Sequence, residues 1–143
     1  MGPDPAVAAA RLAVRRVLAE VPDGPVAVGC SGGADSLALL AATVFECRGS
    51  RHVLGVTVDH GLQDGAAAHA DRVAEQMAAL GADETMTARV GVEADGRGME
   101  AAAREARYAV LEEVARRTGS VAVLLGHTLD DQAETVLLGL TRG

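Results

Sequence analysis

The sequence predicts an α/β fold, in which a parallel β-sheet carries helices on both of its faces. Two observations support this class. Apolar runs of five or six residues alternate with longer segments whose apolar residues recur at helical spacing, and that alternation is typical of βαβ units. The short runs are also continuously apolar, as expected of strands that are covered on both sides.

The first half of the chain predicts two helices and two strands. A helix over 6–20 ends before Pro22, because this proline and the glycine two residues after it terminate helices. The apolar run 26–30 predicts the first strand. Leu and Val then recur every three or four residues over 34–46, which predicts a second helix, and 53–58 predicts the second strand.

The second half repeats this alternation. Glycines follow two of its helical segments, and a glycine-rich stretch predicts a loop between the third strand and the helix that follows it. The predicted elements are a helix over 66–80, a strand over 84–90, a loop over 91–98, a helix over 99–118, a strand over 121–125 and a last helix over 129–140.

Length and composition indicate one domain with one hydrophobic core. The chain has 143 residues, 49% of them apolar, but only one Phe, one Tyr and no Trp. Ala, Val and Leu must therefore fill the interior. Because the chain stops directly after a predicted helix, we expect residues 1–143 to be a fragment of a longer protein.

Net charge, cysteine content and the lack of long apolar runs argue against several classes of protein. The formal net charge is -7, which opposes tight binding to a nucleic-acid backbone by this part of the protein alone. Cys30 and Cys47 follow no C-x-x-C spacing and suit a reduced compartment. The chain has no apolar run long enough for a membrane span and no secretory pattern, so we expect a cytoplasmic protein without membrane contact.

A glycine loop, defined here as residues 31–36, joins the first predicted strand to the second predicted helix. Its sequence is Ser31, Gly32, Gly33, Ala34, Asp35 and Ser36. Glycines let the backbone approach an anion closely, and the N–H groups of a helix start favour phosphate oxygens. The serine hydroxyls would add donors. All 13 basic residues are Arg, which excludes a Walker-type loop with its lysine.

Asp35 adds a metal to this interpretation. A carboxylate beside a polyphosphate would repel it unless a divalent cation lies between them, which predicts Mg²⁺. The alternative is that Asp35, and likewise Ser31 or Ser36, only caps the helix. A dinucleotide site is another alternative, with Asp59 offered to a ribose, but the glycine pattern does not fit G-x-G-x-x-G.

A second polar cluster follows the fourth predicted strand. It contains His127, Asp130, Asp131 and Glu134. If the segment is helical, at least one pair of carboxylates shares a face, and a cation would relieve their repulsion. The carboxyl ends of the strands would bring the cluster close to the glycine loop. As alternatives, the acids stabilise a helix start, and an isolated histidine at a strand end is structural.

Four motifs together resemble a known family. Ser-Gly-Gly-x-Asp-Ser after a strand is similar to the loop of the N-type ATP pyrophosphatases, the PP-loop superfamily, which cleaves ATP between its α- and β-phosphates. Three further motifs resemble the tRNA(Ile)-lysidine synthetase family in their order and spacing. They are Val-Asp-His-Gly-Leu at 58–62, Glu100-x-x-x-Arg104-x-x-Arg107-Tyr108, and Gly-His-x-x-Asp-Asp-Gln-x-Glu-Thr at 126–135.

The resemblance implies a Rossmann-like PP-loop fold and an ATP-binding N-terminal domain over 1–143. It also implies roles for individual residues. Residues 31–36, with Asp59 and His60, would bind the nucleotide, and Asp35 and Asp131 would hold Mg²⁺. The implied catalytic residues are Asp35, Arg104, Arg107, His127, Asp131 and Glu134. Two positions depart from the family pattern, because Thr128 replaces a second histidine and Gln63 a basic residue.

The activity implied by the resemblance is the modification of tRNA(Ile) with a CAU anticodon. Family members adenylate the wobble cytidine with ATP, release pyrophosphate and attach L-lysine to form lysidine. A homodimer is compatible with this reading. Two alternatives remain, namely another PP-loop synthetase, such as a tRNA thiolase or an amidotransferase-coupled enzyme, and a non-catalytic module that binds adenine nucleotides.

Overall fold

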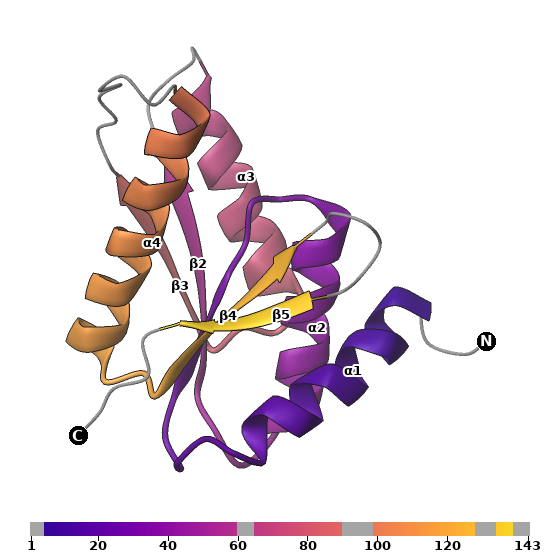
Figure 1. Ribbon diagram of the computed structural model, residues 1–143. Coiled ribbons are helices and arrows are strands. Elements are labelled where there is room, and N and C mark those ends of the chain that lie inside the picture. The colour runs from indigo at the N-terminus through magenta and orange to yellow at the C-terminus, as the bar shows by residue number, and fades with distance from the viewer. Residues whose placement is uncertain (1–4, 60–64, 90–98, 128–133, 139–143) are drawn as a thin grey trace.

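The computed structural model describes residues 5–59, 65–89, 99–127 and 134–138. Their helices and strands alternate along the chain (Figure 1). The helices are α1 (Pro5–Leu18), α2 (Ala34–Cys47), α3 (Ala66–Ala79) and α4 (Met99–Thr118). The strands are β1 (Val26–Gly29), β2 (Val53–Asp59), β3 (Glu84–Arg89), β4 (Ala122–His127) and β5 (Glu134–Leu138).

The strands form one sheet in the order β3-β2-β1-β4-β5. The first four strands of this order are parallel, and β5 is antiparallel to β4. The chain moves outward from β1 to β2 and β3 and then returns to the other side of β1 with β4. This reversal creates a switch point beside β1, where ligands bind in open α/β sheets.

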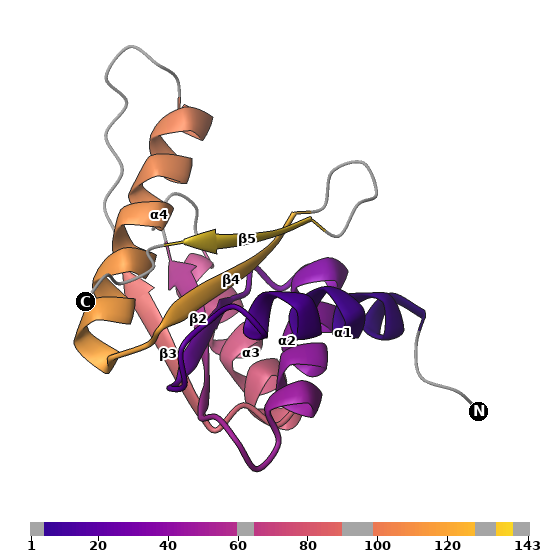
Figure 2. The same cartoon turned by 60° about the horizontal axis from the view of Figure 1, so that its bottom comes forward.

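Helices cover both faces of the sheet, as predicted (Figure 2). Val26 and Val28 of β1 pack with buried residues of α1, α2 and α3. Ala27, which lies between them, packs with Leu111 and Val114 of α4 on the opposite face. Because neighbouring residues of a strand point to opposite faces, continuous apolar runs are what a sheet covered on both sides requires.

The predicted helices and strands are confirmed to within two residues at each end, except for the last helix. A helix over 129–140 is wrong for residues 134–138, which form β5 against β4. The rest of that segment lies outside the described residues. The apolar residues of this segment are compatible with a helix or with a strand. The β-branched side chains of Thr135 and Val136 favour a strand. The backbone N–H and C=O groups on the free edge of β4 gain hydrogen-bond partners when this segment pairs with it.

In the described parts of the chain, every helix is too short or too polar to cross a membrane.

Candidate functional site

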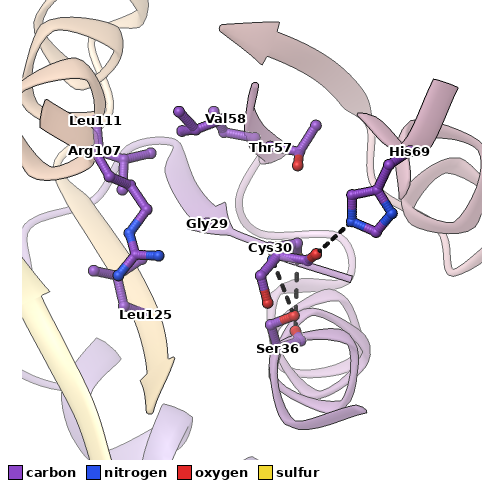
Figure 3. Close-up of a pocket in the computed structure, with 11 residues that line it drawn as sticks. Gly29, Cys30, Ser36, Thr57, Val58, His69, Arg107, Leu111 and Leu125 are labelled. Atoms are coloured by element: carbon purple, nitrogen blue, oxygen red, sulfur yellow. Dashed lines mark hydrogen bonds between the residues drawn. The ribbon is translucent and has the colours of Figure 1, made fainter. Parts of the chain in front are cut away.

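A pocket of about 250 Å³ opens at the carboxyl ends of the parallel strands (Figure 3). It lies at the switch point between β1 and β4. The glycine loop, β2, α3 and α4 form its walls. Its lining residues are Gly29, Cys30, Ser31, Ser36, Val56, Thr57, Val58, His69, Arg107, Leu111 and Leu125. The structure thus places part of the predicted glycine loop at a pocket, as the strand order requires.

The glycine loop is held together by its two serine side chains. The Ser31 N–H donates to Ser36 Oγ at 3.2 Å, and the Ser36 hydroxyl donates to the Gly33 carbonyl at 3.0 Å. The Gly33 N–H donates to Ser31 Oγ at 3.3 Å. Sequence reasoning expected both hydroxyls to donate to phosphate. In this structure the Ser36 hydroxyl hydrogen is instead used inside the loop, where it fixes the backbone.

Helix α2 begins with its first N–H groups available to an anion. Gly33 is the N-cap residue, and no side chain of the described residues caps the helix there. The amides of Ala34, Asp35 and Ser36 therefore occupy the first turn, where helix N–H groups have no partner within the helix. These groups and the helix dipole favour a bound phosphate.

Asp35 is an exposed side chain in the first turn of α2. The alternative that it only caps the helix is wrong, because the cap position belongs to Gly33. In the described parts of the chain, three or more His, Cys, Asp or Glu side chains do not gather at any point. Asp131, the other predicted metal ligand, lies outside these parts.

Arg107 extends from α4 into the pocket, as Figure 3 shows. Its Nε atom is buried and has no hydrogen-bond partner among the described residues. The guanidinium carbon lies 5.9 Å from the centre of the Tyr108 ring. Buried polar groups are normally satisfied, and an unsatisfied one costs stability. A bound anion would supply the missing acceptor, so the structure places this predicted residue where it can bind one.

Asp59 is not among the residues that line the pocket. Its side chain is buried at the end of β2, and its Oδ2 lies 3.7 Å from Arg89 Nε on β3. Thr57 and Val58, just before it on the same strand, do line the pocket. Binding of the nucleotide by the Asp59 side chain is therefore not what this geometry favours.

The second polar cluster is described only in part. His127 ends β4 and Glu134 begins β5, and the two are direct partners in the antiparallel register. The structure thus brings these two predicted residues together across strands rather than along a helix, which corrects the argument from helical spacing. Arg104 lies on α4, one turn before Arg107. His60, Asp130 and Asp131 lie outside the described residues.

Cys30 lies at the pocket, which sequence reasoning did not expect. It was placed inside the first strand, but β1 ends at Gly29 and Cys30 joins the pocket lining. Burial raises the pKa of the Cys30 thiol to about 12, against a smaller opposite effect of its contact with Ser36. Burial also raises the pKa of Cys47. Both thiols stay protonated near neutral pH and are therefore poor nucleophiles or sulfur carriers.

Sequence reasoning missed His69 and Thr57 as pocket residues. His69 is on α3, and its Nε2 lies 3.1 Å from the Ser31 carbonyl oxygen. One signal was present in the sequence, because His69 lies four residues before Val73 and eight before Met77, on one face of the helix. That face is buried against the sheet. Because α3 follows β2 along the chain, its first turn lies at the carboxyl edge of the sheet.

Taken together, a switch-point pocket, a glycine loop at a helix start and an arginine whose buried Nε has no partner among the described residues are the features expected of an α/β domain of the phosphate-binding class. The chain belongs to the PP-loop domain family, whose sequence profile matches residues 8–143.

Curated relatives with high sequence identity carry one name. The chain is 57% identical to a tRNA(Ile)-lysidine synthase of Salinispora tropica over 141 residues, which are 97% of this chain and 42% of that protein. It is 56% identical to the enzyme of the same name from Thermobifida fusca over 144 residues, with coverage of 99% and 44%. The chain thus spans less than half the length of these relatives.

Two solved structures share the fold. A tRNA thiolase from Methanococcus maripaludis has a TM-score of 0.67 at 17% identity, over 88% of this chain and 47% of that one. An ammonia-dependent NAD synthetase from Campylobacter jejuni has a TM-score of 0.56 at 13% identity, over 89% and 57%. At these identities the likeness concerns the fold alone.

Proposed function

We propose that this chain is the ATP-binding domain of a cytoplasmic tRNA(Ile)-lysidine synthase. The observation that carries the proposal is the pocket, which is lined by Ser31 and Ser36 of the glycine loop and by Arg107, whose buried Nε has no partner among the described residues. High identity to curated enzymes of that name supports the choice within the family.

The pocket fits an adenine nucleotide in both polarity and charge. Backbone amides and Arg107 provide donors for phosphate oxygens, and Val56, Val58 and Leu111 provide an apolar wall for a base. The pocket contains no carboxylate among its lining residues in the described parts of the chain. Its donors therefore face an anionic ligand without a competing negative charge on the wall.

Asp35 is the residue that would hold Mg²⁺. It is exposed within the glycine loop and belongs to no cluster of three ligands in the described residues. This fits Mg²⁺, which usually takes one or two protein carboxylates and completes its shell with phosphate oxygens and water. When bound, the ion neutralises charge on the phosphates. Asp131 would be a second ligand.

The residues of this chain contribute to the reaction mainly by positioning and charge. The glycine loop and the first turn of α2 bind the pyrophosphate part of ATP and stabilise the negative charge that it gains as it leaves. Arg107, together with Arg104, binds charge that develops on the α-phosphate of the transferred adenylyl group. His127 and Glu134, paired at the ends of β4 and β5, handle protons or the amine.

The proposed substrates are tRNA(Ile) with a CAU anticodon and L-lysine. The cytidine C2 oxygen attacks the α-phosphorus of ATP, and the bond to pyrophosphate breaks. The lysine ε-amine then attacks C2, and the C2–oxygen bond to AMP breaks, with loss of a proton from the nitrogen. A thiolase is less well supported, because the thiols of Cys30 and Cys47 have raised pKa values.

The metal role of Asp35 is tested by titrating ATP into the wild type and Asp35→Asn with and without Mg²⁺. We expect the variant to bind Mg-ATP about tenfold to a hundredfold more weakly, since it loses a charged ligand. Asp23→Asn is the control, because Asp23 is exposed in the turn before β1. Unchanged affinity in Asp35→Asn would rule the metal role out.

The reaction itself is tested on the full-length protein by measuring pyrophosphate release. We expect release with ATP, L-lysine and tRNA(Ile) together, and lysidine in the tRNA. Release that needs neither lysine nor this tRNA would indicate another PP-loop synthetase. ATP binding without any release would indicate a binding module.

A further inference from the structure

His69 forms a hydrogen bond that ties α3 to the glycine loop. Its Nε2 lies 3.1 Å from the carbonyl oxygen of Ser31 (Figure 3). A carbonyl oxygen can only accept, so Nε2 must carry the hydrogen and donate it. Val73, one turn further along α3, is buried below the same loop.

This hydrogen bond sets the orientation of the Ser31–Gly32 peptide. The described residues contain no cis peptide bond, and in a trans peptide the C=O and N–H bonds point in opposite directions. Because the Ser31 carbonyl points toward His69, the Gly32 N–H points away from α3. Gly32 has φ +98°, a conformation that glycine adopts without strain.

The Gly32 amide differs from its neighbours in the loop. The Ser31 and Gly33 N–H groups donate to serine hydroxyls of the loop itself. Among the described residues, no acceptor takes the Gly32 N–H. This donor is therefore available to a ligand, and its direction depends on where the Ser31 carbonyl is held.

The loop also packs directly on the face of α3 that carries His69. A Cβ atom added at Gly32 would lie 2.9 Å from Val73 Cγ2 and 3.3 Å from His69 Cε1. The first of these distances is shorter than real Cβ contacts, so only a glycine fits at position 32 against this face of α3. The loop backbone and His69 therefore lie next to each other at the start of α3.

We propose that His69 is a positioning residue of the pyrophosphate site, which orients the Gly32 N–H toward the departing pyrophosphate by holding the Ser31 carbonyl against α3. The inference rests on the proposed use of ATP. His69 acts through the loop backbone and not as a charged ligand, so a neutral side chain with a donor at the same reach serves equally well.

The first test uses the ligand-free, full-length protein and NMR. In mildly alkaline buffer, where a free histidine is neutral, we expect ¹⁵N shifts of the His69 ring that show hydrogen on Nε2. We also expect the Gly32 amide resonance to move in His69→Leu and to return in His69→Gln. Two results would overturn the proposed orientation of the Gly32 N–H, and neither needs a ligand. One is hydrogen on Nδ1 of His69, and the other is a Gly32 amide resonance that does not change in His69→Leu.

The second test measures the affinity for inorganic pyrophosphate and for ATP, with Mg²⁺, in the same variants. His69→Leu should bind both about tenfold more weakly, which is the range of one hydrogen bond, and His69→Gln should regain most of the loss. Adenosine, which has no phosphate, should bind equally to all variants. Gln76→Leu, an exposed change on the same helix, is the matched control.

The outcomes separate this inference from the proposed function. Failure of the wild type itself to bind ATP and pyrophosphate overturns the proposed function. If the wild type binds both but His69→Leu binds as tightly, the positioning role is overturned and the proposed function stands. If His69→Gln is as weak as His69→Leu, the imidazole contacts the ligand by its own charge, which also overturns the inference.

Discussion

Substitution of Arg107 should affect ATP binding and the free energy of unfolding in different ways. Its Nε is buried without a partner among the described residues, so the arginine stabilises the ligand-free fold little. We expect Arg107→Met, which keeps an unbranched apolar side chain, to bind ATP about tenfold to a hundredfold more weakly. Its free energy of unfolding should equal or exceed that of the wild type, because a buried unsatisfied group is removed.

These two quantities are measured by ATP titration and by urea unfolding. Arg117→Met is the control, because Arg117 is exposed at the last turn of the same helix and pairs with Glu113. A less stable Arg107→Met that binds ATP like the wild type would show that Arg107 has a structural role and no part in binding.

Arg51 connects the end of α1 to the start of β2. Its guanidinium donates to the carbonyl oxygens of Pro22 at 2.7 Å, Gly24 at 3.0 Å, Val21 at 3.1 Å and Leu18 at 3.4 Å. These carbonyls include orphan groups of a helix end, which need partners. A planar guanidinium can reach several acceptors at once, whereas a lysine ammonium is a single point.

We therefore expect Arg51→Lys to lower the free energy of unfolding by about 1 to 3 kcal/mol, the range for hydrogen bonds to a charged donor. Urea unfolding measures the change. Arg48→Lys, at an exposed position just after α2, should change stability by less than about 0.5 kcal/mol. Equal stability of both variants would show that water replaces these hydrogen bonds without cost.

At the scale of elements, Glu46 joins α1 to α2. Its carboxylate accepts from Arg11 Nε at 2.9 Å and from Arg15 at 3.0 and 3.1 Å. Hydrogen bonds from Arg15 first and Arg11 second lower the pKa of Glu46 from its usual 4.5. Arg11 also lies over the ring of Phe45, 3.8 Å from its centre, so both helices meet at a packed charged contact.

This contact should make part of the stability depend on pH. Because the pKa of Glu46 is lower in the folded chain than in the unfolded one, its contribution is full above pH 4.5 and is lost as the pH falls below that value. We expect Glu46→Gln to lower the urea midpoint at neutral pH and to differ little from the wild type in strong acid. Glu20→Gln, an exposed change in the turn after α1, should show no such pH-dependent difference.

The helices and strands differ in how well the local sequence predicts their type and their ends. α2 and α4 were predicted to within one residue, because each has a long helical pattern with a glycine at one or both ends. For β5 the same kind of pattern gave the wrong element. A short apolar run fits a helix or a strand, and pairing with the free edge of β4 is a contact that no local pattern contains.

At the scale of the whole molecule, net charge should separate the two proposed ligands. Residues 1–143 carry a formal net charge of -7, so few counterions would be released from an RNA backbone. We expect this chain to bind Mg-ATP but to show little specific affinity for tRNA(Ile) in a filter-binding assay. A tight and specific complex would contradict the argument from charge, and a scrambled tRNA of equal length is the control.

The candidate site was predictable where its residues share one segment. The glycine loop was found because Ser31 to Ser36 are contiguous and lie between a strand and a helix. Arg107 was proposed from a family motif, and its position in the pocket follows from the packing of α4 on β1 and β4. His69 and Cys30 were missed because their roles depend on contacts with distant segments.

The class of fold, the limits of nearly all helices and strands, and the position of the glycine loop that we propose as the phosphate site were predictable from the sequence, because periodicity, glycines and helix ends act over a few neighbouring residues. The remaining features depend on how the chain packs in three dimensions. The tertiary structure turned Asp59 toward Arg89, used the Ser36 hydroxyl inside the loop and brought His69 to the Ser31 carbonyl. The Asp59 and His69 contacts join residues that are far apart in the sequence, so no local sequence pattern predicts them. The Ser36 bond is local, but residue type alone does not say whether a hydroxyl donates to its own loop or to a ligand.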